Sequence, residues 1–248
     1  MAVAGGPNIV EDGLVLALDA ANVKSYPGSG ANWNNLAGTV TGSLVNGPSL
    51  DTDNVGSIYF DGSNDYGVIA HSDLTYDRTA FTVEVFVKPW AIHSGYRNGP
   101  FNKWNTGGGT VNEFAISFGT GSSGLAPGAF TVQSWDTTGG SYGKGAYTAG
   151  GTTNYEVGKW THLVGTFFSG SVKFYKDGVL EGVNEDWASA YSYAKTVDTL
   201  SFKIADFNET TYFGAKANIA QIRMYSGKAL TASEVLQNYN ATKGRFGL

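Results

Sequence analysis

The chain has 248 residues, of which 35 are Gly and none is Cys; 42% are hydrophobic and only 15% are charged. Glycine weakens helix interiors by about 1 kcal/mol per residue, so this density excludes a helical bundle, and the apolar content excludes a disordered chain. The net charge of −5 and the scattering of Lys and Arg as single residues argue against nucleic acid or an anionic membrane as a partner, since both need a basic face. The length suits a single all-β domain.

The absence of Cys also excludes disulfide, thiolate and Cys-based metal chemistry. Residues 1–7 lack the basic and apolar regions of a secretory signal. No apolar run approaches the roughly 20 residues that a membrane span needs. We therefore expect no membrane insertion, and either a cytoplasmic protein or one that leaves the cell by another route.

Apolar residues that alternate with polar ones predict strands along most of the chain. The clearest case is residues 81–88, where Phe81, Val83, Val85 and Val87 share one face. Further strands are predicted at 113–118, 161–167, 172–176, 179–180, 199–204 and 219–225.

Turn residues separate these predicted strands. Ser169-Gly170 and Asp177-Gly178 predict two tight turns, the first of which joins 161–167 and 172–176 into a hairpin. Asp61–Asp65 predicts another tight turn, since Asp, Asn and Gly favour Asx-turns and positive φ. The Gly-rich residues 139–151 are interpreted as a long surface loop within one domain.

One helix is predicted near the C-terminus. Thr231 and Glu234 have the spacing of a capping box, and Val235, Leu236 and Tyr239 then lie on one side. The helix should end before Gly244.

Three blocks of sequence resemble the concanavalin A-like, laminin G-like jelly-roll superfamily. They are residues 58–66 with 81–84, residues 159–167 with 173–178, and residues 217–225 with 230–235. The resemblance implies an all-β fold, namely a jelly-roll sandwich of two antiparallel sheets with one short C-terminal helix. We expect an N-terminal arm at 1–12, the jelly-roll domain at 13–242 and a C-terminal tail at 243–248.

The two ends of the chain resemble a smaller group of proteins within this superfamily. Residues 13–22, 25–30 and 33–36, together with 238–248, resemble laminin G-like proteins of tailed-phage virions, especially those of cyanobacterial phages. This implies a structural or interaction protein of a virion, as capsid decoration or as part of the tail or fibres. It would assemble in the host cytoplasm with other virion proteins or with copies of itself, and would bind host-surface glycans.

The alternative is a carbohydrate-binding, lectin-like module that is free or on the cell surface, with calcium assisting. In either case we predict no enzyme. Glycosidases on this fold place acidic residues at alternating positions of one strand, whereas Glu84 has Phe86 as its neighbour at i+2. His71, His93 and His162 lack metal-ligand spacing, and a buried structural role beside Trp160 is expected for His162.

Aromatic side chains on loops are candidates for stacking on sugars. Most of the aromatic residues must fill the core, and the least core-like tryptophans are Trp104, Trp135 and Trp187. These three are the predicted glycan-binding residues.

No cofactor is required by these predictions, but the resemblance implies calcium ligands in two loops, near 112–113 and 206–209. The candidate ligands are Asn112, Asp206 and Asn208, whose side-chain oxygens suit a hard cation. Where a further acidic ligand is expected, the chain has Val111. Solvated turn residues are the alternative, and Asp19 and Asn22 are similarly either a strand-end turn or a second ion site.

Overall fold

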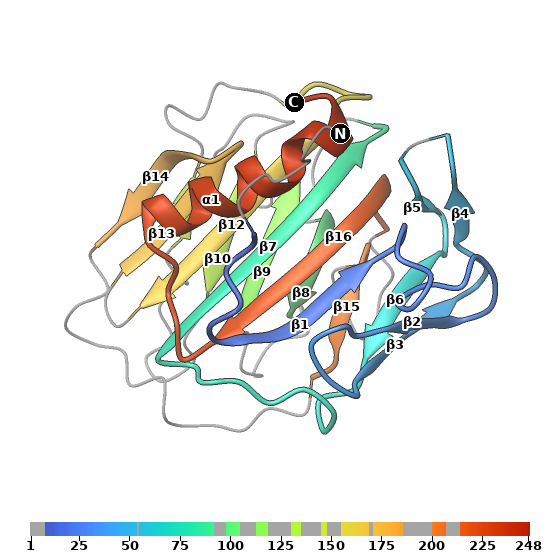
Figure 1. Cartoon of the computed structure of the whole chain (residues 1–248), viewed down its shortest axis with the longest axis horizontal. Helices are drawn as coiled ribbons and strands as arrows, with labels where there is room; N and C mark the ends of the chain where they lie inside the picture. Colours follow the sequence, from blue (N-terminus) through green and yellow to red (C-terminus); the bar gives the residue numbers. More distant parts are fainter. Residues whose placement is uncertain are drawn as a thin grey trace, which may run out of the picture.

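The computed structural model describes residues 8–53, 55–91, 98–104, 113–118, 130–134, 145–147, 155–168, 171–185, 200–206 and 214–248. Within these residues the strands form two antiparallel sheets of eight strands each. The sheets pack face to face, and a helix crosses the outer face of one of them (Figure 1). This confirms the predicted fold class.

The sheet under the helix is called sheet A. In spatial order it contains β14 (Val179–Asn184), β13 (Ser171–Lys176), β12 (Thr161–Phe168), β7 (Ala80–Pro89), β16 (Lys216–Ser226), β5 (Ser57–Asp61) and β4 (Ser49–Asp51), while β1 (Leu14–Asp19) also pairs with β16. Sheet B contains β11 (Gly145–Tyr147), β10 (Phe130–Ser134), β9 (Phe114–Phe118), β8 (Asn98–Lys103), β15 (Phe202–Ile204), β6 (Tyr66–Ile69), β3 (Thr41–Val45) and β2 (Asn32–Asn34).

The main core lies between the sheets. Phe81, Val83, Val85 and Val87 of β7 all enter it, as the alternation predicts. Sheet B contributes Phe114, Ile116, Phe118, Phe130 and Val132, among others. The other face of β7 is buried as well, because further chain covers sheet A there.

The covering layer consists of α1 (Ala232–Thr242) and the 3₁₀ helix η2 (Lys243–Phe246). Val235 of α1 packs on Val164, Tyr175 and Tyr225 from three strands of sheet A. The capping box is confirmed: the Thr231 hydroxyl accepts from the Glu234 amide, and the Glu234 carboxylate accepts from the Thr231 amide. Neither of the two helices among the described residues has the length and apolarity to cross a bilayer.

Thr231→Ala should lower the free energy of unfolding by about 1 kcal/mol, because the amide of Glu234 loses its acceptor. Thr39→Ala, at an exposed loop position, is the matched control and should leave stability within about 0.5 kcal/mol. Urea denaturation of both variants measures the difference. Equal stabilities would mean that the cap contributes nothing.

The chain ends are packed more closely than the predicted arm and tail imply. Of the arm, the structure describes residues 8–12, and Val10 is buried on sheet A, where its amide donates to Asn238 Oδ1 at 2.8 Å. Of the tail, Phe246 is buried and its ring stacks on Phe86 at 4.4 Å. Residues 8–12 and the tail therefore add to the layer that covers sheet A.

The hairpin of β12 and β13 and the turn at Asp177-Gly178 are confirmed, and both turn residues have positive φ, 51° and 80°. Ser169 and Gly170 lie outside the described residues. The predicted loop 139–151 needs a correction, because Gly145–Tyr147 form β11 and pair with β10. The rest of that segment lies outside the described residues.

Candidate functional site

A buried carboxylate organises the outer face of sheet A. Glu84 of β7 has a side chain that is 1% exposed, and it forms an ion pair with Arg223 of β16. It also lies 3.1 Å from His162 Nε2 of β12 and accepts from Asn238 Nδ2 of α1 at 2.7 Å. Glu84 thus joins three strands to the helix.

Burial raises the pKa of Glu84, but the charge of Arg223 and the contacts with His162 and Asn238 outweigh it. The net effect lowers the pKa to about 2, so the carboxylate is ionised at neutral pH. The expected burial of His162 is confirmed, and its ring stacks between Phe86 at 4.4 Å and Tyr239 at 5.7 Å.

A row of polar side chains continues from this cluster toward η2. Arg223 Nη2 donates to Gln221 Oε1 at 2.8 Å, and Gln221 Nε2 donates to Asp19 Oδ2 at 2.6 Å. At the end of the row, Arg245 Nη1 of η2 donates to Asp19 Oδ1 at 2.7 Å. Asp19 also accepts from the amide of Ala21, so the predicted strand-end turn is confirmed with these additional partners.

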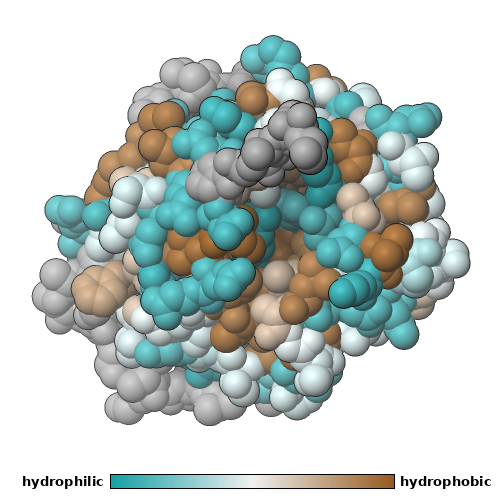
Figure 2. All heavy atoms as spheres, in the orientation of Figure 1, coloured by the Kyte–Doolittle hydropathy of each residue, from teal (hydrophilic) through white to brown (hydrophobic). Residues whose placement is uncertain are grey.

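A groove of about 410 Å³ lies beside the row. It is lined by Ile9, Glu11, Leu14, Ala17, Leu18, Asp19, Leu36, Ala37, Gln221 and Arg223. Figure 2 shows this face of the molecule, with a hollow near its centre that is bordered by hydrophilic and hydrophobic residues. The groove therefore offers both hydrogen-bonding groups and aliphatic surface.

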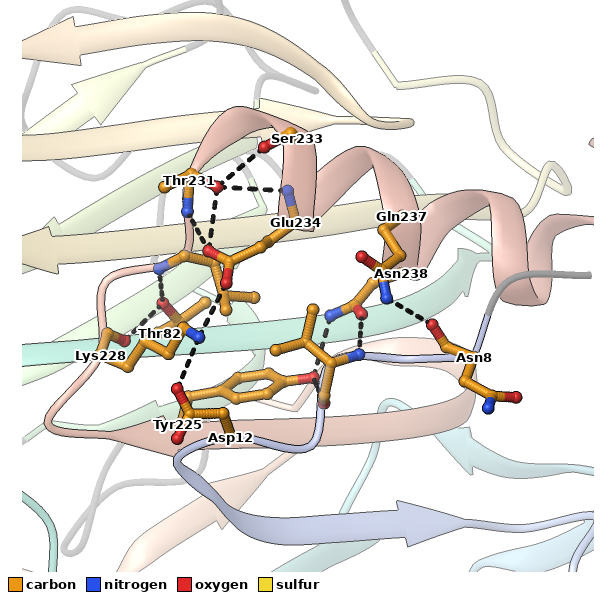
Figure 3. Close-up of polar contacts among 12 residues, drawn as sticks. Asn8, Asp12, Thr82, Tyr225, Lys228, Thr231, Ser233, Glu234, Gln237 and Asn238 are labelled. Atoms are coloured by element: carbon orange, nitrogen blue, oxygen red, sulfur yellow. Dashed lines mark hydrogen bonds and ion pairs between the residues drawn. The ribbon is translucent and has the colours of Figure 1, made fainter.

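The N-terminal segment, residues 8–12, forms one wall of the groove and is fixed from several sides (Figure 3). The Tyr225 hydroxyl donates to the carbonyl of Val10 at 3.0 Å, opposite the contact of the Val10 amide with Asn238. Gln237 Nε2 donates a hydrogen bond to the carbonyl of Asn8 at 2.7 Å. Lys228 forms ion pairs with Asp12 at 2.8 Å and Glu234 at 2.7 Å.

A second buried charge cluster lies at one end of sheet B. Lys103 Nζ is 2.8 Å from Glu113 Oε1, and Arg78 and the Tyr76 hydroxyl also contact this carboxylate. Burial raises the pKa of Glu113, but Lys103, Tyr76 and Arg78 outweigh it and lower the pKa. The Glu113 carboxylate is thus engaged by protein groups at one of the two loops where calcium was expected.

The predicted glycan-binding residues are only partly within the described structure. Trp104 is 1% exposed, which corrects the expectation of a rim aromatic, because a ring this enclosed offers no face to a sugar. Trp135 and Trp187 lie outside the described residues.

The predicted calcium ligands are also only partly within the described structure. Asp206 is 3% exposed, and its backbone carbonyl accepts a hydrogen bond from Asn102. Asn112 and Asn208 lie outside the described residues. Within the part of the chain that the structure describes, no three His, Asp or Glu side chains gather as metal ligands would.

The Asp61–Asp65 segment is a tight turn, as predicted. Asp61 Oδ1 accepts from the amides of Ser63 at 2.7 Å and Asn64 at 3.3 Å, and Gly62 has φ 77°. The bond from Ser63 is the main cause of the lowered pKa of Asp61. The carboxylate oxygen Oδ1 therefore stabilises the turn by accepting both hydrogen bonds.

Solved structures similar to this chain include carbohydrate-active proteins. Domain 4 of AbnA, a GH43 extracellular arabinanase from Geobacillus stearothermophilus in complex with arabinotriose, has 18% identity and a TM-score of 0.65 over 91% of this chain and 98% of that chain. The Trypanosoma rangeli sialidase has 16% identity and a TM-score of 0.65 over 94% of this chain but 33% of that one. The binding domain of botulinum neurotoxin serotype D has 14% identity and a TM-score of 0.65, over 93% and 52%.

The chain thus spans the whole arabinanase domain, a third of the sialidase and half of the toxin domain. No curated protein sequence matches it. A family model, the concanavalin A-like lectin/glucanases superfamily, matches residues 60–236. Since this match covers most of the chain and the two-sheet sandwich agrees with it, the chain belongs to the concanavalin A-like lectin/glucanases superfamily.

Proposed function

We propose that the chain is a non-enzymatic, carbohydrate-binding interaction protein of a phage virion, as capsid decoration or as part of the tail or fibres. The observation that carries the carbohydrate part is the full-length likeness to arabinanase domain 4, which is in complex with arabinotriose. That likeness spans 98% of a separate domain, which suits a binding module that folds as one unit.

The engagement of the buried carboxylates supports a non-enzymatic role. Glycoside hydrolysis needs two carboxyl groups that reach the scissile bond from opposite sides. Glu84 and Glu113 have side chains that are 1% and 5% exposed, and each is held by cationic side chains. Neither is placed to donate a proton to a substrate at the surface.

For the carbohydrate part, we propose Trp135 and Trp187 as sugar-stacking residues, with no cofactor required. Titration calorimetry with arabinotriose should show binding that persists in chelator and weakens at least tenfold in Trp135→Ala or Trp187→Ala. Phe168→Ala, which removes a ring that is 57% exposed, is the control and should bind like the wild type. Binding lost in chelator would instead favour the calcium-assisted lectin, with Asn112, Asp206 and Asn208 as the proposed ligands.

The virion part is supported by the resemblance of both chain ends to laminin G-like proteins of tailed-phage virions. We propose assembly in the host cytoplasm, with other virion proteins or copies of the chain itself as partners. Immunogold labelling of purified particles should place the protein on heads, for a decoration protein, or on tails. Unlabelled particles would contradict the virion role and favour a free or cell-surface lectin-like module.

A further inference from the structure

We propose that the groove on the outer face of sheet A, between residues 9–14 and 35–37, binds a short neutral saccharide. This inference rests on the proposed carbohydrate-binding function and assigns it a site built from described residues, in addition to the proposed Trp135 and Trp187. The volume of about 410 Å³ lies within the range of small-molecule sites.

The frame of the groove is held in place by hydrogen bonds on both sides. On one side, Asn238 and Tyr225 fix both backbone groups of Val10 (Figure 3). On the other side, the Asn35 side chain accepts from the Ala17 amide at 2.7 Å and donates to the Val15 carbonyl at 2.8 Å. A frame fixed in this way loses little conformational entropy when a ligand binds.

The loop on this second side also pairs directly with β1. The Leu36 amide donates to the carbonyl of Ala17 at 2.9 Å, and Leu36 itself is 43% exposed. Ala17 lines the groove between the two walls, and its small side chain leaves the space open. Aliphatic side chains on both sides can therefore cover the apolar face of a sugar ring.

The polar row supplies hydrogen-bonding groups along the groove. Arg223, Gln221 and Asp19 all line it, and their mutual bonds orient them before any ligand arrives. A guanidinium has five N–H donors, of which Arg223 uses Nη1 for Glu84 and Nη2 for Gln221. The planar carboxylate, amide and guanidinium groups lie side by side along the groove, and such groups can form hydrogen bonds with neighbouring hydroxyls of a sugar.

The charges select a neutral ligand. The guanidinium of Arg223 is paired with Glu84, and that of Arg245 with Asp19, so neither cation is left to attract an acidic sugar. Glu11 adds a further carboxylate to the lining. A sialylated or sulfated saccharide would meet the like charge of Glu11, and among the described residues that line the groove no cation is left unpaired to compensate it.

Amide NMR titration of the full chain tests this site, with arabinotriose and maltotriose as neutral probes and sialyllactose as the acidic probe. We expect a neutral probe to shift the amides of residues 14–19 and 221–223, and sialyllactose to bind at least tenfold more weakly. Ala17→Leu fills the groove and should weaken the binding reported by these amides at least tenfold. Ala232→Leu, on the exposed first turn of α1, is the matched control and should bind like the wild type.

Thermal unfolding of both variants checks that the fold is intact, and Leu36→Ala tests the second wall if Ala17→Leu unfolds. Shifts confined to other regions, with normal binding by Ala17→Leu, would overturn the groove and leave carbohydrate binding standing. Tighter binding of sialyllactose than of the neutral probes would overturn the neutral class. The absence of any shift in the wild type would overturn this site, while a panel of other glycans decides the proposed function separately.

Discussion

Replacing Arg223 with methionine should lower the free energy of unfolding by roughly 3–5 kcal/mol at pH 7. Methionine has a similar length but no charge, so the substitution leaves the Glu84 carboxylate buried without its cation. The remaining partners, His162 and Asn238, do not replace a guanidinium. Urea denaturation followed by tryptophan fluorescence measures the change.

Lys159→Met is the matched control, because its ion pair with Glu156 has both side chains more than 60% exposed. This variant should lose less than about 1 kcal/mol. An equally small loss in Arg223→Met would contradict the account of the buried pair.

The dependence of stability on pH gives a second readout of the same pair. The folded-state pKa of Glu84 is lowered to about 2, so its contribution is fully present above the ordinary pKa of a glutamate, about 4.3, and is lost as the pH falls toward 2. The difference in stability between wild type and Arg223→Met should therefore shrink over this range. A difference that is constant from pH 5 to pH 2 would mean that Glu84 does not titrate there.

Phe167→Ala should destabilise the chain by about 3–5 kcal/mol, as expected for a large cavity in a packed core. The ring of Phe167 is fully buried, stacks on Phe81 at 4.3 Å and contacts Phe114 across the sandwich. The two sheets meet at these rings, so the substitution removes contacts from both. Urea denaturation measures this loss.

The neighbouring residue on β12 provides the control. Phe168 has its side chain on the other face and is 57% exposed, so Phe168→Ala should change stability by less than about 1 kcal/mol. Equal effects of the two substitutions would contradict the assignment of the faces of β12.

Short sequence patterns predict the strands and the helix that depend only on residues near one another in the chain. The alternation in 81–88 fixes the inward face of β7, and the spacing of Thr231 and Glu234 fixes the start of α1. The short strands β2, β4 and β11 have three residues each and carry no period that could be recognised. Their pairing partners, and not their own residues, place them in the sheets.

The polar clusters could not be predicted, because their members are far apart in the sequence. Glu84 is the one acidic residue of β7 and meets Arg223 only when β7 pairs with β16. Lys103 is fully buried although its residue type predicts exposure, since Glu113 provides its counter-charge. A lone charged residue inside an otherwise apolar strand is the signal that could have indicated such a pair.

The most direct test of the carbohydrate-binding account is an array of neutral and acidic glycans probed with the labelled full chain. Saturable binding to neutral glycans is expected, with the same affinity in the control Ala232→Leu and with no release of cleaved sugar on long incubation. A uniformly blank array would contradict carbohydrate binding, and hydrolysis of any bound glycan would contradict the non-enzymatic role.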